Sequence, residues 1–302
     1  MKLGIDLGNG WTKFDGMKFA SSVGLGKLSK VGEKHPEIHQ VELDGMHYIV
    51  GRIEDGSFLG DNRYTSDSYK ICLLTAIALA SKSRGINGKV KAEICVGLPI
   101  NLYNDGLGEK LAEHIKGYNT QTIIVNGEEY DIQMKSVVVF PEGALVVKDG
   151  DMGSVLTIDI GSGTVNVVEW EGGRPKEDKT LPRSMGNMYS RIGSYLSDLG
   201  ATHDARQIEK LLYDEKRIVV VNQEEHDVTR AIEGIIENTV SRMASDIRTH
   251  FTNWKSISKI KLLGGGSIPT FNAWKKEFPA ITLSDDSQFV NSEIFSMIVR
   301  SV

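Results

Sequence analysis

Two segments of the chain repeat one arrangement of residues that can bind anions and metal ions. They are Leu3-Gly-Ile-Asp-Leu-Gly-Asn-Gly-Trp-Thr-Lys-Phe14 and Leu156-Thr-Ile-Asp-Ile-Gly-Ser-Gly-Thr-Val-Asn-Val-Val168. In each, an apolar run ends in an aspartate, Asp6 or Asp159, and is followed by an apolar residue, Gly-x-Gly and a second run typical of a β-strand. Glycine lets backbone N–H groups approach an anion closely, and a carboxylate at a strand end can hold a hydrated Mg²⁺. The pattern therefore predicts two β-turn-β units that bind phosphate groups.

The spacing of the two copies indicates an internal duplication. One copy opens each half of the 302-residue chain. We expect the glycines to supply turn conformations that other residues resist, and the two loops to face each other and hold a nucleotide's phosphates from both sides. A single Asp-x-Gly-x-Gly also occurs in ordinary tight turns, but its presence at the start of both halves favours phosphate binding.

The composition is that of a globular protein and excludes several classes. The chain is 40% hydrophobic and 25% charged, with a net charge of −5, which argues against direct, non-specific nucleic-acid binding. No apolar run is long enough for a membrane span, and the N-terminus is predicted to be a core strand, so we expect a cytoplasmic protein. Cys72 and Cys95 lie in apolar runs and are predicted to be core residues. His35 and His39 lie in a polar loop and are expected to be solvated.

The first half is predicted to combine strands with buried helices. Short β-like pieces between Met17 and about Asp61 predict a small strand-rich flap. Ser66 through Lys82 predicts a helix, because Ser66 can cap it and its residues are apolar nearly all round. Asn126-Gly127 predicts a hairpin turn. The other elements expected in this half are strands at 2–7, 11–15, 91–99, 121–125, 129–134 and 135–140, and a helix at 105–115.

Pro141-Glu142-Gly143-Ala144 follows one of these strands and is predicted to start a helix. Glu142 would then lie in the first helical turn at the tip of a strand, where sheet proteins keep their ligands. Its carboxylate could position or deprotonate a water that attacks the γ-phosphate. The alternative is a glutamate that only stabilises the helix start through the helix dipole.

The second half is predicted to repeat the mixed α/β pattern. Gly264-Gly265-Gly266 follows a buried strand and would let an adenosine lie against bare backbone, which is compatible with a tight strand-to-helix turn. Strands interleaved with helices predict an α/β fold with a mixed sheet in each of two lobes. The elements expected here are strands at 154–160, 164–170, 176–181, 217–221, 257–263 and 281–283, and helices at 184–199, 204–213, 225–251, 269–278 and 288–299.

Taken in order, these motifs resemble the actin-like ATPase superfamily, which includes actin, heat-shock chaperone ATPase domains and sugar kinases. The resemblance covers essentially the whole chain. It implies an actin-like, duplicated ribonuclease H-like fold, with lobe I at 1–148 plus a returning helix at 285–302, lobe II at 149–284, and a nucleotide cleft between them. The matching segments are phosphate-1 at Asp6–Lys13, connect-1 at Pro141-Glu142, phosphate-2 at Asp159–Thr164, adenosine at Leu263–Ser267 and connect-2 at Phe289–Phe295.

Within the superfamily, the chain is most similar to bacterial plasmid-partitioning actins of the ParM, StbA and AlfA type. The compact length, the Phe-Val-Asn…Phe ending and Pro-Glu at connect-1 carry this resemblance. It implies binding of ATP/ADP, or GTP, with Mg²⁺, polymerisation into a filament of identical subunits, and hydrolysis within the filament. It also implies movement of plasmid DNA through a ParR-like DNA-binding adaptor, with no direct contact to nucleic acid or membrane.

The resemblance assigns roles to individual residues. Asp6 and Asp159 would hold Mg²⁺, mostly through water, and would act with Glu142 in catalysis, although turn-capping aspartates are an alternative. Lys13 would neutralise phosphate charge, or would be an exposed strand lysine. Glu209 would reach the sugar, but a solvated glutamate on an amphipathic helix explains it equally well. The residues predicted to contact the nucleotide are Gly8, Asn9, Gly10, Trp11, Thr12, Lys13, Gly161, Ser162, Gly163, Thr164, Gly186, Glu209, Gly264, Gly265 and Gly266.

Two other functions fit the same superfamily. A small-molecule kinase for a sugar or acid needs an aspartate base beside an acceptor pocket, whereas connect-1 here offers a glutamate suited to water. A chaperone-like ATPase is disfavoured because we expect no substrate-binding domain or linker after Val302, although a separate partner chain could supply one. The filament-forming nucleotidase is therefore preferred.

Overall fold

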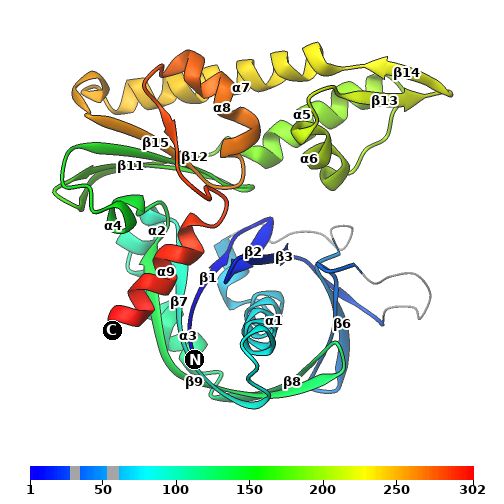
Figure 1. The fold of residues 1–302 in the computed structure, drawn as a ribbon, viewed down its shortest axis with the longest axis vertical. Coiled ribbons are helices and arrows are strands. Elements are labelled where there is room, and N and C mark those ends of the chain that lie inside the picture. The colour runs from blue at the N-terminus through cyan, green and yellow to red at the C-terminus, as the bar shows by residue number, and fades with distance from the viewer. Residues whose placement is uncertain (28–34, 53–60) are drawn as a thin grey trace. The chain divides into compact units, whose positions relative to one another are not determined.

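The computed structural model describes residues 1–27, 35–52 and 61–302, and it contains two compact units (Figure 1). Unit 1 consists of Met1–Lys148 and Phe289–Val302, and unit 2 consists of Asp149–Gln288. Each unit contains a mixed sheet with helices, so the predicted α/β class is confirmed. The nucleotide cleft between the lobes stays a prediction. Within the described ranges, no helix has the length and apolar character needed to cross a membrane.

Unit 1 is built on a sheet that curves around one helix. Among the described residues, nine strands pair in the order β3-β2-β1-β7-β9-β8-β5-β6-β4. In Figure 1, helix α1 lies inside the curve of this sheet. The bounds are β1 Lys2–Leu7, β2 Trp11–Phe14, β3 Met17–Ala20, β4 Val23–Leu25, β5 His39–Leu43, β6 Met46–Val50, the 3₁₀ helix η2 Asp61–Thr65, α1 Asp67–Ser83, β7 Gly88–Leu98, α2 Ile100–Asn104, α3 Leu107–Lys116, β8 Thr120–Val125, β9 Glu128–Pro141, α4 Leu145–Asp149 and α9 Val290–Ser301.

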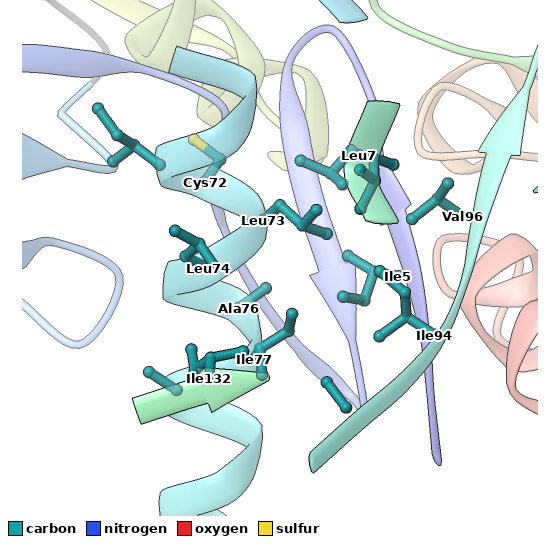
Figure 2. Packing of buried hydrophobic residues seen from close by; sticks show 14 of the residues in the cluster. Ile5, Leu7, Cys72, Leu73, Leu74, Ala76, Ile77, Ile94, Val96 and Ile132 are labelled. Atoms are coloured by element: carbon teal, nitrogen blue, oxygen red, sulfur yellow. The ribbon is translucent and has the colours of Figure 1, made fainter. Parts of the chain in front are cut away.

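The sequence of α1 explains why this helix is enclosed. Ser66 caps it, since the backbone N–H of Tyr69 donates to Ser66 Oγ at 3.2 Å. Apolar side chains such as Leu73 and Ile77 cover it nearly all round, and they pack against strand residues such as Ile5 in one buried cluster (Figure 2). The predicted helix and its cap are therefore confirmed.

The segment predicted as a flap is part of the main sheet. Strand β3 pairs with β2, and β5 pairs with β8, so its strands extend the sheet at both ends. The prediction of strands is confirmed, but a separate flap is wrong, because Val41 and Val50 belong to the core that also contains α1. Residues 28–34 and 53–60 of the predicted flap lie outside the described residues.

Strand β9 corrects a second prediction. Asn126 and Gly127 form the expected hairpin turn, with φ angles of 53° and 85°. The two strands predicted at 129–134 and 135–140 are one continuous strand of 14 residues, which pairs with β8 along its first part and with β7 along nearly all its length. Strand β7 pairs with β9 on both sides of the junction, with a register irregularity between Ala92 and Glu93, and keeps the backbone extended where nothing local in the sequence joined the two runs.

Unit 2 repeats the central part of unit 1. Among the described residues, its main sheet has the order β12-β11-β10-β15-β16, with two antiparallel pairings followed by two parallel ones. The order β3-β2-β1-β7-β9 in unit 1 has the same sequence of pairings, which confirms the duplication. The bounds are β10 Val155–Ile160, β11 Val165–Glu171, β12 Arg174–Leu181, α5 Met185–Asp198, α6 Ala205–Tyr213, β13 Ile218–Val221, β14 Glu224–Asp227, α7 Thr229–His250, the 3₁₀ helix η3 Trp254–Ser256, β15 Lys259–Leu263, α8 Ser267–Glu277 and β16 Thr282–Leu283.

One helix of unit 2 starts later than predicted. The helix expected at 225–251 begins at Thr229, because Glu224–Asp227 pairs with β13 in a hairpin. Asn222 and Gln223, with φ angles of 51° and 69°, form the turn of this hairpin. Neither residue is a glycine, so no strong local signal predicted this turn.

Helix α9 packs on the sheet of unit 1 through glycines. A Cβ atom on Gly4 of β1 would lie 2.1 Å from the backbone nitrogen of Ser296, and one on Gly97 of β7 would lie 2.5 Å from Phe295 Cζ. The N–H of Gly4 donates to Ser296 Oγ at 3.1 Å. Both strands therefore need glycine where the helix crosses them.

The substitution Gly4→Ala tests this packing. Because the new methyl group would meet helix backbone that cannot move aside, we expect a loss of about 3 kcal/mol or more in the free energy of unfolding. Gly234→Ala is the control, since that helical glycine has open space around its Cβ position and should gain about 0.5–1 kcal/mol. Urea denaturation of both variants measures the difference, and a Gly4→Ala protein as stable as the wild type would contradict the packing argument.

His39 lies in β5 and is buried, so the prediction of a solvated histidine is wrong. It packs edge-on against Phe19 at 5.6 Å, and Asn126 Nδ2 lies 3.1 Å from its Nδ1 atom. Burial lowers the pKa of His39 from 6.5 to about 4. The neutral ring is therefore the form that the fold accommodates.

This lowered pKa predicts a loss of stability in acid. Between pH 6.5 and 4 the unfolded chain binds a proton at His39 and the folded chain does not, so stability falls as the pH falls through that window. The loss should approach about 3 kcal/mol by pH 4. His39→Gln should flatten the slope of stability against pH. An unaltered slope in the His39 variant would refute the assignment.

Candidate functional site

The first candidate carboxylate is held by an ion pair at the end of a central strand. Asp6 on β1 lies opposite Lys13 on β2, and Lys13 Nζ lies 3.1 Å from Asp6 Oδ2. Lys13 is only 9% exposed, so the alternative of an exposed strand lysine does not apply. The pair places a positive and a negative group directly beside the first glycine loop.

The two glycine loops have the same hydrogen bond. The N–H of Gly8 donates to the Trp11 carbonyl at 3.0 Å, and the N–H of Gly161 donates to the Thr164 carbonyl at 2.9 Å. A Cβ atom on either glycine would lie 3.0 Å from that same carbonyl oxygen. Neither glycine has a positive φ, so the close approach of backbone, and not an unusual turn conformation, is what favours glycine there.

Each loop is hydrogen-bonded to a segment further along its own unit. In unit 1, Gly10 O accepts from the N–H of Ser21 at 2.9 Å, and the buried Thr12 Oγ1 lies 2.9 Å from Ser21 Oγ. In unit 2, the N–H of Gly186 donates to Ser162 O at 2.9 Å, at the start of α5. The residues of both loops are half-buried. They are Gly8, Asn9, Gly10, Trp11, Gly161, Ser162, Gly163 and Thr164.

Glu142 lies in a turn, and its predicted place in a first helical turn is wrong. Helix α4 begins only at Leu145, because Gly143 has a φ of 78° that interrupts helical geometry. The backbone N–H of Glu142 donates to Leu98 O at 2.8 Å, and that of Gly143 donates to Asn291 Oδ1 at 3.0 Å. The turn is thus fixed by β7 on one side and by α9 on the other, and the helix-dipole alternative for Glu142 does not apply.

Strand register brings Glu142 to the same sheet edge as the first glycine loop. Ile5 of β1 pairs with Val96 of β7, and Leu98 of β7 pairs with Pro141 of β9, in parallel ladders. The carboxyl ends of these three strands therefore meet at one edge, where ligands bind in α/β sheets. Glu142 itself is 9% exposed.

Sequence reasoning missed one buried charge at this edge. Arg63 of η2 donates from Nη1 to the Leu7 carbonyl at 3.2 Å and from Nη2 to Tyr64 Oη at 2.8 Å. Burial lowers the pKa of Arg63, but the charges of Tyr64 and Glu142 raise it, and the net change is upward. Arg63 lies in a polar stretch without a motif, so no sequence signal distinguished it from a solvated arginine.

In unit 2, the triple glycine packs against the second aspartate. Asp159 of β10 pairs with Leu263 of β15, so Gly264 follows directly beside it. Gly264 has a φ of 85°, and a Cβ atom there would lie 2.3 Å from Asp159 Oδ1. A Cβ atom on Gly266 would lie 2.4 Å from Ile160 Cγ2, whereas the nearest atom to one on Gly265 is Gln288 Nε2 at 4.0 Å. Two of the three glycines are required by packing, and Gly265 leaves space beside its backbone.

The two halves of the chain match known family models. Residues 4–144 match the model described as Actin like proteins N terminal domain, and residues 157–274 match the one described as Archaeal actin homologue MreB-like, C-terminal. The chain belongs to the actin-like ATPase superfamily. A search of curated proteins found no match to the sequence.

Solved structures share the fold of this actin-like protein along its whole length. The structure of Ta0583, an archaeal actin homolog, has a TM-score of 0.80 at 19% identity and covers 100% of this chain and 99% of that chain. A 15-stranded ParM filament from Clostridium botulinum has a TM-score of 0.81 at 19% identity, with the same coverage. At this level of identity the two structures establish the actin-like fold.

Glu209 of the actin-like chain lies in a cluster with two tyrosines. Tyr213 Oη donates to Gly265 O at 3.3 Å, which places α6 beside the triple glycine. Burial and then the charge of Glu209 raise the pKa of both Tyr189 and Tyr213. Glu209 is half-buried, and its contact with a sugar stays a prediction.

The carboxylates fit a metal ion that arrives with a ligand. Each actin-like unit offers one buried aspartate at the end of its central strand, Asp6 or Asp159. Across the described part of the chain, no cluster of three or more histidine, cysteine, aspartate or glutamate side chains could hold a metal by itself. Mg²⁺ commonly takes one or two carboxylates and completes its shell with water and phosphate oxygens, so these residues suit it in the presence of a nucleotide.

We expect the Asp6–Lys13 ion pair to stabilise the fold at the first loop. Lys13→Met should lower the free energy of unfolding by about 3 kcal/mol, because it leaves the buried Asp6 carboxylate without the lysine charge. The double variant Asp6→Asn/Lys13→Met should recover most of that loss, since both charges are removed. Urea denaturation of the three proteins makes the comparison, and equal losses in the single and double variants would show that the pair has no such role.

Proposed function

We propose that this actin-like protein is a nucleoside triphosphatase that binds ATP or GTP with Mg²⁺, assembles with copies of itself, and hydrolyses the nucleotide in the assembled state. The observation that carries the proposal is the same aspartate-glycine loop, with the same backbone hydrogen bond, at the equivalent strand of each unit. A duplicated anion-binding loop is suited to a ligand with several phosphate groups.

We assign each group of residues a role in binding the nucleotide. The N–H groups of the loops at 8–12 and 161–164, other than those of Gly8 and Gly161 that donate within the loop, bind phosphate oxygens. Lys13 neutralises part of the phosphate charge. Each unit would offer one carboxylate, Asp6 or Asp159, to a hydrated Mg²⁺, which would lower the negative charge of the phosphates when it is bound. Gly265, with Tyr213 and Glu209 beside it, receives the nucleoside.

Glu142 orients the attacking water and accepts its proton. The water oxygen forms a bond to the γ-phosphorus while the bond from that phosphorus to the bridging oxygen of the nucleoside diphosphate breaks, and inorganic phosphate leaves. Phosphoryl transfer depends mainly on positioning and on electrostatic stabilisation, so a carboxylate held in a rigid turn suits the task.

Solved structures support the nucleotide and the assembly. Ta0583 has been solved as a complex with ADP, with a TM-score of 0.78 to this chain, and the ParM of Clostridium botulinum forms a filament. We further propose that the filament moves plasmid DNA in the cytoplasm through a ParR-like adaptor. A net charge of −5 suits a protein that reaches DNA through a basic partner instead of directly.

Light scattering and phosphate release, measured together after addition of ATP or GTP with Mg²⁺, test the proposal. We expect assembly at micromolar protein, followed by phosphate release and disassembly. Removal of Mg²⁺ with a chelator should prevent both. Turnover that requires an added sugar, without assembly, would instead identify a small-molecule kinase.

Glu142→Gln tests the catalytic assignment. We expect phosphate release to slow by about 10²–10⁴-fold because the carboxylate is lost, while nucleotide-driven assembly remains and the filaments persist longer. Glu113→Gln on the exposed side of α3 is the matched control and should hydrolyse at the wild-type rate. Normal phosphate release by the Glu142 variant would remove Glu142 from the catalytic role.

A further inference from the structure

Lys18 of β3 is a second lysine beside the first glycine loop, and the proposed steps give it no role. It lies directly opposite Lys13 of β2, which in turn lies directly opposite Asp6 of β1. Directly opposed residues project from the same face of a sheet. Lys18 therefore shares the face that carries the Asp6–Lys13 ion pair.

The Trp11 ring holds the ammonium of Lys18 next to the loop. Lys18 Nζ lies 4.3 Å from the centre of the Trp11 ring, which is close enough for a cation–π interaction. Trp11 is paired with Ala20 and lies two residues before Lys13, so the side chain of Lys18 leans along the sheet toward the loop. The Trp11 carbonyl accepts the hydrogen bond from Gly8 that closes the loop. The ammonium is thus in contact with a residue of the loop itself.

The charge of Lys18 has no carboxylate partner among the described residues. Asp6 pairs with Lys13 at 3.1 Å, whereas Lys18 forms no ion pair or hydrogen bond with any residue that the structure describes. Two ammonium groups directly opposite each other repel, and this repulsion destabilises a pair of strands. Lys18 is half-buried, which reduces the screening of its charge by salt. An anion bound at the loop would offset this charge.

The second unit shows that the fold does not require a charge at this position. Its duplicated strands place Asn166 where unit 1 has Lys13, and Thr180 where unit 1 has Lys18. These two side chains are neutral, and Thr180 Oγ1 donates to Asn166 Oδ1 at 3.1 Å. The loop with the same backbone hydrogen bond forms in both units, so a lysine is not needed to build it. The second ammonium is specific to the loop of unit 1.

We propose that Lys18 is a phosphate-binding residue: its ammonium, held over the Trp11 ring, is a second cation that neutralises phosphate charge at the first glycine loop. The proposal rests on the proposed function, in which this loop binds a nucleotide. The flexible four-carbon stem lets the ammonium move from the ring to a phosphate oxygen. Because electrostatic attraction grows with the charge of the ligand, Lys18 favours a triphosphate over a diphosphate.

Equilibrium binding to wild type, Lys18→Gln and Lys18→Arg tests the proposal. The ligands are hydrolysis-resistant analogues of ATP and GTP, together with ADP and GDP, all with Mg²⁺ and at a protein concentration too low for assembly. We expect the affinity of Lys18→Gln for the triphosphate to fall about tenfold, and its affinity for the diphosphate to fall less. Lys18→Arg keeps the charge and should retain most of the affinity.

Lys255→Gln is the matched control. Lys255 Nζ also lies over a tryptophan, 5.7 Å from the centre of the Trp254 ring, but in η3, which precedes β15. The second glycine loop lies beside the other end of β15, because Asp159 pairs with Leu263. Lys255→Gln should therefore bind all four ligands as the wild type does.

Salt dependence separates a charge effect from a change in the fold. The loss of affinity in Lys18→Gln should shrink as NaCl rises from about 0.05 to 0.5 M, because salt screens the charge that the variant lacks. Urea denaturation checks that the variant is folded. If it is not, Lys18→Thr, which copies the equivalent residue of unit 2, takes its place in the same titrations.

Unchanged triphosphate affinity in the neutral variant, an equal loss in Lys18→Arg, or a loss that salt does not reduce would overturn the role of Lys18. Each of these results leaves the proposed function standing, provided that the wild type binds and hydrolyses a nucleotide. A wild-type protein that binds none of the four ligands refutes the proposed function, and the role of Lys18 with it.

Discussion

The close approach of backbone at Gly8 and Gly161 is the constraint on which the rest of the structure depends. At each position the glycine N–H donates a hydrogen bond to the carbonyl of the residue three positions later. A Cβ atom on the glycine would crowd that same carbonyl oxygen. The loop can be this tight only because a rigid buried strand leads into it and a paired strand leads out of it. The result is a tight backbone loop directly after a carboxylate, formed twice in one chain.

The two copies have diverged in the residue opposite the aspartate. Asp6 is opposite Lys13 and forms an ion pair with it, whereas Asp159 is opposite the neutral Asn166, which accepts a hydrogen bond from Thr180. The duplicated backbone is therefore conserved within the chain while the electrostatics differ. An internal repeat of this kind keeps the backbone geometry of the loop while the side chain opposite the aspartate changes.

Distant parts of the chain complete the edge of the sheet in unit 1. Asn291 of α9 fixes the turn that carries Glu142, although the two residues are separated by nearly half of the sequence. Gly4 and Gly97 allow α9 to lie directly on β1 and β7. The position of Glu142 is thus set by packing between a strand and a helix, and it owes nothing to the helix start that Pro141 suggested.

The sequence by itself determined the elements whose signal is local. The local elements are the two glycine loops, the capped and largely apolar helix α1 and the Asn126-Gly127 turn. They follow from steric and hydrogen-bonding preferences of neighbouring residues, so they could be predicted. The family could also be predicted, because its motifs lie in a fixed order. Only the tertiary structure decided what depends on partners far along the chain: the union of two predicted strands in β9, the burial of His39 and Lys13, and the place of Arg63 at the end of β1. A polar residue looks the same in a sequence whether it is solvated or buried, since what distinguishes the two is the acceptor or the opposite charge that the fold brings to it.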